Sequence, residues 1–178
     1  MKQPSRRRFV TALAAFAPLA LPARAAFAAA PSRALGLRHL HTGERLDVEY
    51  FAGGRYRPDA LAAVDRLLRD FRSGEVAAID PGLLDLLHAL AAATGAQDRP
   101  FEVISGFRSP STNEMLRHRS SGVASGSLHM RGQAIDIRVA GVPLAGLRDA
   151  ALALRGGGVG FYPASDFVHV DTGRVRAW

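Results

Sequence analysis

The chain contains no cysteine, and this absence excludes several chemistries at once. Disulfide bonds, thiolate metal sites, iron–sulfur clusters and thiol nucleophiles all require that residue. Lysine is nearly absent as well, because Lys2 is the only one among 178 residues. The chain beyond residue 2 therefore has no lysine for Schiff-base or Ser-Lys catalysis. Any metal ion would have to be held by histidine, aspartate or glutamate.

What is present describes an ordinary globular protein. Hydrophobic residues make up 48% of the chain and charged residues make up 22%. These fractions exclude an intrinsically disordered chain, a collagen-like repeat and a low-complexity sequence. The length suits a single domain that can bury a core.

Basic charge is concentrated at the start of the chain. Of the 23 basic residues, five lie within residues 1–28, where there is no acidic residue. The basic run Arg6-Arg7-Arg8 precedes a short apolar stretch, residues 12–21, and an alanine-rich run with Ala-x-Ala patterns follows. This order is typical of an export signal, and the paired arginines resemble the twin-arginine type. An uncleaved membrane anchor or a basic arm is the alternative interpretation.

We therefore expect a twin-arginine signal peptide over residues 1–28 and one mature domain over residues 29–178. Removal of the signal leaves 18 basic and 16 acidic residues and lowers the formal net charge from +7 to +2. A charge this small gives no reason to expect a nucleic-acid partner. We expect a monomeric periplasmic protein, exported by the twin-arginine machinery and without a stable membrane span after cleavage.

Hydrophobic periodicity predicts an α+β fold. It predicts a hairpin over residues 35–41 and 45–51, and a helix that begins at Pro58 and extends to Phe71. Further helices are predicted over residues 80–95, 111–118 and 144–154, the second of them capped by Ser111, and further strands over residues 101–104, 133–139, 159–162 and 167–171. This order favours a single domain with a small, mainly antiparallel sheet flanked by helices.

Three polar side chains stand where they would be costly without a partner. Asp136 and His169 each lie between two branched apolar residues of a predicted strand, so each projects from the opposite face. His129 precedes Asp136 by seven residues, and Gly132 allows a turn that brings both to one side. Two imidazoles and one carboxylate can form a three-ligand zinc site with an open position for water. Such a site favours hydrolysis, because zinc polarises a carbonyl and lowers the pKa of water to roughly 7.

The same residues also allow an interpretation without a metal. Asp136 could form a surface ion pair with Arg138 or Arg131, and His169 could be a core histidine bonded to the backbone. The pattern alone leaves both interpretations open, because a motif needs structural context to confirm it.

Four separated motifs carry a resemblance to a known group. They are Ser105-Gly106-Phe107-Arg108-Ser109, Ser127-Leu128-His129, Gly132-Gln133-Ala134-Ile135-Asp136 and Phe167-Val168-His169-Val170-Asp171. They are similar to signatures of the zinc D-alanyl-D-alanine peptidase superfamily, which also holds lysostaphin-type enzymes and the hedgehog signalling fold. Within it, residues 127–136, 157–163 and 167–178 are most similar to the murein endopeptidase K branch of exported peptidoglycan hydrolases.

The resemblance implies a hedgehog/D-Ala-D-Ala peptidase-like fold, one zinc ion bound by His129, Asp136 and His169, and hydrolysis of the peptide cross-links of peptidoglycan. It also implies that Arg108 contacts the substrate or the developing oxyanion, a role that suits a guanidinium at the mouth of a cleft. Two rival functions stay open: a carboxypeptidase that removes a terminal D-alanine, and a non-catalytic, zinc-stabilised module that binds the cell wall.

The chain departs from the superfamily at the residue expected to accept a proton from the attacking water. Better-known relatives carry a glutamate three residues before the last zinc histidine or a histidine two residues before it, and here those positions hold Asp166 and Phe167. We expect Asp166 to take a proton from the attacking water, although the same residue suits an ordinary turn. Asp171 is expected to orient a ligand imidazole, with an arginine ion pair as its alternative, and Ser127 to support the site by hydrogen bonding.

Overall fold

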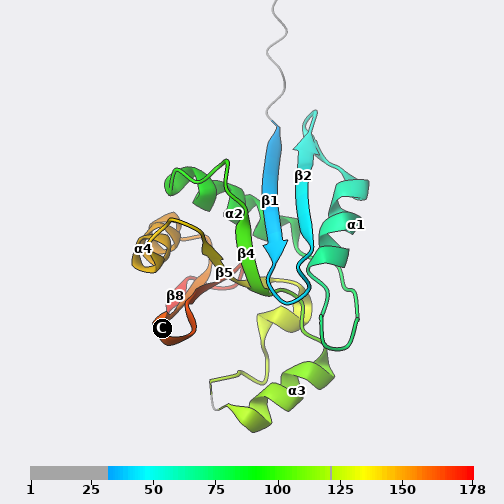
Figure 1. Cartoon of the computed structure of the whole chain (residues 1–178), viewed down its shortest axis with the longest axis vertical. Coiled ribbons are helices and arrows are strands. Elements are labelled where there is room, and N and C mark those ends of the chain that lie inside the picture. Colours follow the sequence, from blue (N-terminus) through cyan, green and yellow to red (C-terminus); the bar gives the residue numbers. More distant parts are fainter. Residues whose placement is uncertain (1–31, 121) are drawn as a thin grey trace, which may run out of the picture.

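One mixed sheet of eight strands organises the described part of the chain, in the order β3-β2-β1-β4-β5-β7-β6-β8 (Figure 1). The computed structural model describes residues 32–120 and 122–178, so the predicted signal segment lies outside the described residues. The strands are β1 (Arg33–His39), β2 (Arg45–Ala52), β3 (Arg55–Tyr56), β4 (Phe101–Ser105), β5 (Ala134–Val139), β6 (Gly158–Tyr162), β7 (Phe167–Asp171) and β8 (Arg176–Ala177).

Four α-helices and two short 3-10 turns complete the described elements. The helices are α1 (Pro58–Leu67), α2 (Pro81–Ala93), α3 (Pro110–Arg119) and α4 (Leu144–Leu154), and the turns are η1 (Leu128–Arg131) and η2 (Pro163–Ser165). Among these helices, none has the length and apolar character needed to cross a membrane.

The predicted α+β class with a mainly antiparallel sheet is confirmed. Only β1 with β4 and β6 with β8 pair in parallel, whereas the other neighbouring strands of the described sheet are antiparallel. The sheet is wider than the sequence predicts. Its two edge strands, β3 and β8, have two residues each and are too short to leave a periodic pattern.

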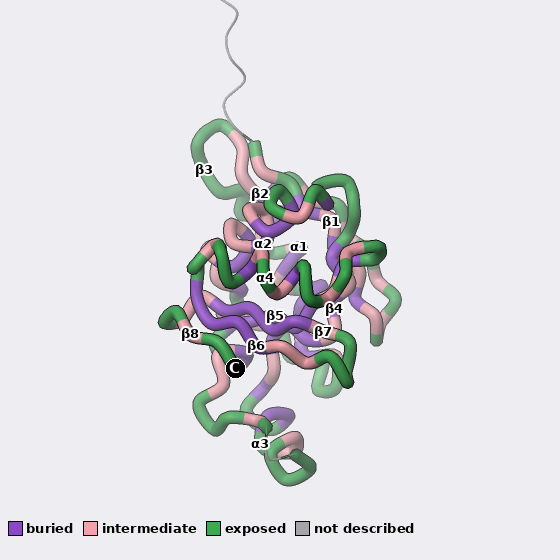
Figure 2. The backbone as a smooth tube through the Cα atoms, turned by 90° about the vertical axis from the view of Figure 1, so that its left-hand side faces the viewer, coloured by how far each residue is buried: buried purple, intermediate pink, exposed green. Residues whose placement is uncertain are grey.

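The core lies between one face of the sheet and three helices. Strand residues such as Leu37, Val103 and Ile137 share one apolar cluster with side chains of α1, α2 and α4. Figure 1 shows α3 set apart from these helices, and Figure 2 shows the central strands β5 and β7 as buried. Because side chains alternate along a strand, the neighbours of these core residues point to the opposite face.

The register of the sheet aligns a row of residues on that second face. Asp136 pairs with Ser105 of β4 and with His169 of β7, and His169 pairs with Gly160 of β6. Directly paired residues of antiparallel strands point to the same side of the sheet. The row therefore brings two of the predicted metal ligands together.

Two predicted helix boundaries are wrong. Helix α1 ends at Leu67 rather than Phe71, because the chain turns at Leu68 and the ring of Phe71 instead stacks on His41 at a centroid distance of 4.1 Å. Helix α3 is capped by Ser109 rather than Ser111. Pro110 takes the first helical position, and the Ser109 hydroxyl accepts a hydrogen bond from the N–H of Thr112.

The turn after α1 fixes the loop that carries Arg108. Asp70 is buried, and its carboxylate accepts hydrogen bonds from the N–H and hydroxyl of Ser109 at 2.9 and 2.8 Å. Burial alone would raise the pKa of this carboxyl, but hydrogen bonds from Thr112, Ser109 and Arg72 outweigh it and lower the pKa to about 2. Asp70 therefore stays ionised and ties two segments that are far apart in sequence.

We expect Asp70→Asn to lower the free energy of unfolding at neutral pH by about 1–3 kcal/mol, because hydrogen bonds to a charged acceptor are weakened. The folded-state pKa lies below that of an unfolded aspartate, so this contribution is present above pH ~4 and is lost as the pH falls toward about 2. Urea unfolding of the wild type and of Asp70→Asn across this pH range should show that the difference between their free energies of unfolding becomes smaller as the pH falls. The exposed Asp98→Asn is the control, and a difference that does not change with pH would contradict the assignment.

Candidate metal centre

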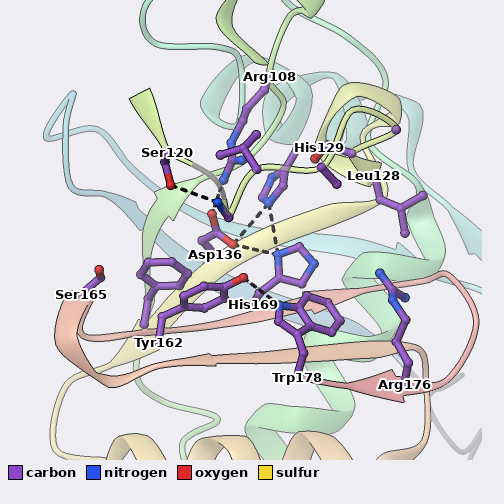
Figure 3. A pocket seen from close by; sticks show the side chains of 16 residues that line it. Arg108, Ser120, Leu128, His129, Asp136, Tyr162, Ser165, His169, Arg176 and Trp178 are labelled. Atoms are coloured by element: carbon purple, nitrogen blue, oxygen red, sulfur yellow. Dashed lines mark hydrogen bonds and ion pairs between the residues drawn. The ribbon is translucent and has the colours of Figure 1, made fainter. Parts of the chain in front are cut away.

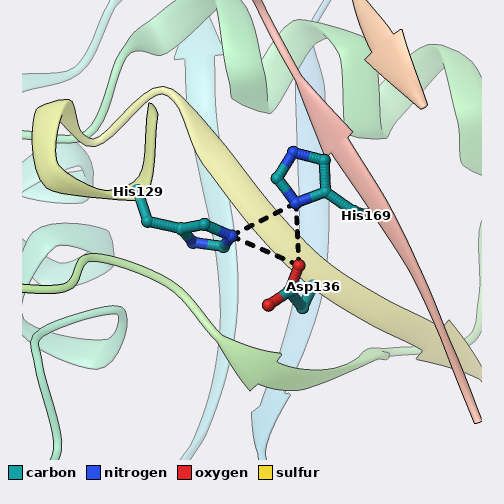
Figure 4. Close-up of side chains that lie close together, drawn as sticks. All are labelled: His129, Asp136 and His169. Carbon is teal, nitrogen blue, oxygen red and sulfur yellow. Dashed lines mark hydrogen bonds and ion pairs between the residues drawn. The ribbon is translucent and has the colours of Figure 1, made fainter. Parts of the chain in front are cut away.

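The three predicted ligands lie together in the structure (Figure 4). His129 comes from η1, Asp136 from β5 and His169 from β7, and their ligand atoms all lie within 4.8 Å of one another. Asp136 Oδ1 lies 3.2 Å from His129 Nε2 and 2.9 Å from His169 Nδ1. All three residues are buried.

Hydrogen bonds on the outer side of each ring determine what the inner nitrogens can do. His129 Nδ1 lies 2.7 Å from the carbonyl oxygen of Gly106, and His169 Nε2 lies 3.1 Å from Asp171 Oδ2. Because both partners only accept hydrogen bonds, each outer nitrogen carries a proton, and each inner nitrogen offers a lone pair whenever its ring is neutral. Burial lowers the pKa of His129, which favours its neutral ring, whereas contacts with Asp136 and Asp171 outweigh burial and raise the pKa of His169.

When both rings are neutral, as metal ligation requires, three acceptors face one another in a buried space. Two imidazole lone pairs and a carboxylate oxygen repel one another unless a cation lies between them. Imidazole nitrogen together with carboxylate oxygen is a ligand set that zinc accepts. The residues present thus fit a divalent metal ion, which is the first of the two interpretations that the sequence leaves open.

Asp171 lies where an imidazole-orienting residue is expected. Its carboxylate is fully buried and accepts hydrogen bonds from the N–H groups of Gly158 and Gly173 at 3.0 and 2.8 Å. Arg176 contacts both of its oxygens, at 3.1 and 2.7 Å. Burial opposes ionisation, but His169, Arg176 and the two backbone groups together lower the pKa of Asp171. The arginine ion pair and the contact with His169 are both present.

Arg108 contacts a predicted metal ligand directly. Its Nη2 donates to Asp136 Oδ2, and its Nε donates to the hydroxyl of Ser105 at 2.9 Å. Burial would raise the pKa of Asp136, but the neighbouring His129, His169 and Arg108 outweigh it and hold that pKa low. The arginine engages the outer oxygen of Asp136, which leaves Oδ1 facing the two histidines.

The ligands open onto a cavity of about 430 Å³ (Figure 3). Its lining consists of Arg108, Ser120, Gly122, Val123, Ala124, Gly126, Ser127, Leu128, His129, Asp136, Tyr162, Ser165, Phe167, His169, Arg176 and Trp178. Ser127 is thus a wall residue, and its hydroxyl does not cap η1. Its predicted supporting role stays a prediction.

The structure does not bring Asp166 into this cavity. Its neighbours Ser165 and Phe167 line the wall, whereas Asp166 is not among the lining residues. Its carboxylate accepts a hydrogen bond from Arg138 at 2.6 Å, and its side chain is 63% exposed. The residue follows η2 with a φ of 53°, a backbone conformation typical of a turn. Its role as proton acceptor stays a prediction, and its position outside the lining of the cavity favours the alternative, a turn residue.

Sequence reasoning missed part of the surroundings of the site. Gly106 contacts His129 through its backbone carbonyl. Every residue has such a carbonyl, so the pattern of side chains does not indicate this contact. Arg176 and Trp178 both line the cavity, and their spacing of two would place them on one face of a strand. That spacing is the signal that could have identified them.

Comparison with known proteins agrees with this geometry. Residues 27–178 match the model of the family described as "Peptidoglycan L,D-endopeptidase MepK". The chain is 46% identical over 160 residues to the protein of that name from Escherichia coli strain K12, covering 90% of this chain and 87% of the relative. It is also 46% identical over 146 residues to the "Probable peptidoglycan L,D-endopeptidase MepK" of Haemophilus influenzae, covering 82% and 78% of the two chains. The resemblance carried by the motifs is confirmed, and the chain belongs to the peptidoglycan L,D-endopeptidase MepK family.

Proposed function

We propose that the chain is an exported zinc metallopeptidase that hydrolyses peptide cross-links of peptidoglycan, as an L,D-endopeptidase like its relatives. The observation that carries this proposal is the buried set of three acceptors, His129, Asp136 and His169, at the base of an open cavity. Membership of an endopeptidase family supports the type of reaction.

Each residue around the site has a distinct role in the proposed reaction. A zinc ion held by His129, Asp136 and His169 would supply a Lewis acid that polarises the scissile carbonyl and activates water. Gly106 and Asp171 hold the two imidazoles in the tautomers that ligation requires. Arg108 holds the outer oxygen of Asp136 and lines the cavity, where its guanidinium can also bind a substrate carboxylate or the developing oxyanion.

Digestion of purified muropeptides tests the reaction. We expect the zinc-loaded protein to convert cross-linked dimers into monomers, and a chelator to abolish this activity until zinc is restored. If the dimers stay intact with zinc present, the proposed endopeptidase function is excluded. Release of terminal D-alanine without loss of the cross-link would indicate a carboxypeptidase, and binding without cleavage would indicate a wall-binding module.

Removal of a proposed ligand gives a second test. We expect His129→Ala to lose zinc and to lower kcat/KM by about 100-fold or more, because three ligands are needed to fix the ion. His118→Ala is the matched control, because His118 is an exposed histidine that contacts only Glu114 within the described ion pairs. Full activity and unchanged metal content in His129→Ala would contradict the assignment.

Two variants separate the possible roles of Asp166. Asp166→Asn removes one exposed ion pair, and Arg138→Gln removes that pair together with the contact between Arg138 and Glu102 at 2.7 Å. A structural role therefore predicts a small effect of Asp166→Asn that is no larger than that of Arg138→Gln. We expect this result, with kcat within about threefold of wild type, because exposed ion pairs contribute little. A loss of ~100-fold confined to Asp166→Asn, with a changed pH profile, would instead establish Asp166 as the proton acceptor.

We also propose that residues 1–28 direct export by the twin-arginine route to the periplasm, where the mature protein acts as a monomer. Replacement of Arg6 and Arg7 by lysine should keep the precursor inside the cell, because the receptor recognises the arginine pair. Cell fractionation with an antibody to the protein provides the measurement. A normal periplasmic level of the doubly substituted protein would exclude this route.

A further inference from the structure

Three aromatic side chains form one wall of the cavity beside the metal ligands. The rings of Phe167 and Tyr162 stack with centroids 4.6 Å apart, and Trp178 Nε1 donates to the Tyr162 hydroxyl at 2.7 Å. Figure 3 shows Trp178 and Tyr162 next to His169, whose ring centroid lies 5.2 Å from that of Trp178. We call Phe167, Tyr162 and Trp178 the aromatic wall.

The fold holds Trp178 in place from several sides. Its N–H donates to Val159 at 3.2 Å, and its carbonyl accepts from Phe161 at 3.1 Å, which attaches it to β6. A Cβ on Gly160 would lie 2.8 Å from both the Trp178 and the Tyr162 ring, so the two rings lie over bare backbone. The Arg176 guanidinium lies 4.7 Å from the Trp178 ring centroid. Arg176 also contacts Asp171, and Asp171 in turn orients His169.

Despite these contacts, Trp178 is 51% exposed. The single polar atom of its side chain is already engaged by Tyr162, so the side-chain surface left for a ligand is the apolar ring. Large exposed aromatic surface costs free energy in water, and a surface that is already fixed loses little entropy when it binds. Arg176 already supplies a cation beside the Trp178 ring, so the exposed surface that remains is suited to an aliphatic group.

Resting on the proposed function, we propose that Trp178 is a specificity-determining residue that receives an aliphatic side chain of the cross-linked peptide. Trp178 lies beside His169, so a group in contact with its ring lies next to the bond that is cut. That bond belongs to the peptide, which is why we assign the surface to a peptide side chain rather than to a sugar ring. Arg108, on another side of the same cavity, is left for the substrate carboxylates.

Steady-state kinetics with cross-linked muropeptides test this role. We expect Trp178→Ala to raise KM by about fivefold to twentyfold and to leave kcat within about threefold, because the lost contact is one of binding. Metal content should equal that of wild type, and Trp178→Phe should recover part of the loss. Val175→Ala is the control, because Val175 has the same 51% exposure as Trp178 and does not line the cavity.

A binding measurement tests the proposal without hydrolysis. Trp178 is the only tryptophan in the chain, so the intrinsic tryptophan fluorescence of the zinc-loaded protein comes from this site. We expect a monomeric muropeptide, which has no cross-link to cut, to shift the emission and to reduce quenching by acrylamide. The peptide-free disaccharide should do neither at the same concentration.

The outcomes distinguish this proposal from the proposed function. A protein that cuts dimers normally but shows an unchanged KM in Trp178→Ala would overturn only the role of Trp178. A kcat loss without a change in KM, or an equal fluorescence response to the disaccharide, would also overturn it. A fluorescence response to the muropeptide in a protein that cuts no cross-link would remove the endopeptidase function and retain the binding surface. Absence of any response would overturn the binding surface.

Discussion

The pairing register of four adjacent strands is the constraint on which the rest of the structure depends. It aligns Ser105, Asp136, His169 and Gly160 in one row on the face away from the helices. A slip of one residue between β5 and β7 would turn every side chain of the shifted strand to the other face. Charged groups would then enter the apolar cluster, and Val168 and Val170 would face the cavity. The packing that fills the core therefore also fixes the register that assembles the site.

Burial of two carboxylates in one site requires compensating charge, and arginine provides it in both cases. Asp136 contacts Arg108 on its outer side, and Asp171 contacts Arg176 through both oxygens. The planar guanidinium can donate to two acceptors in a fixed geometry, which a lysine ammonium does not match. Each arginine also lines the cavity, so the groups that balance the buried charge take part in shaping the binding surface.

The sequence predicts the ligands better than it predicts their supports. Alternation along two strands identifies Asp136 and His169, and the turn allowed by Gly132 adds His129. Motif similarity then favours the interpretation with a metal over the one without, and all of these signals lie in residue identity. The support from Asp70 could not be predicted, since it depends on a contact with Ser109 across 39 residues of chain. The ion pair of Asp166 with Arg138 likewise requires knowing which strands lie side by side. Periodicity overextends α1 because Leu68 stays buried in the turn that ends the helix.

The position of Gly106 links the site to the first half of the domain. Its carbonyl holds His129, and a Cβ at this residue would lie 2.6 Å from the carbonyl oxygen of Leu68 at the end of α1. The N–H of Phe107 donates to the same Leu68 carbonyl at 2.8 Å, so the segment that contacts His129 is attached to the end of α1. Ion affinity and conformational stability are therefore thermodynamically linked, since an ion that binds only the folded chain stabilises it by mass action. Substitutions near α1 would thus alter how tightly the domain holds the proposed ion, although they lie outside the cavity.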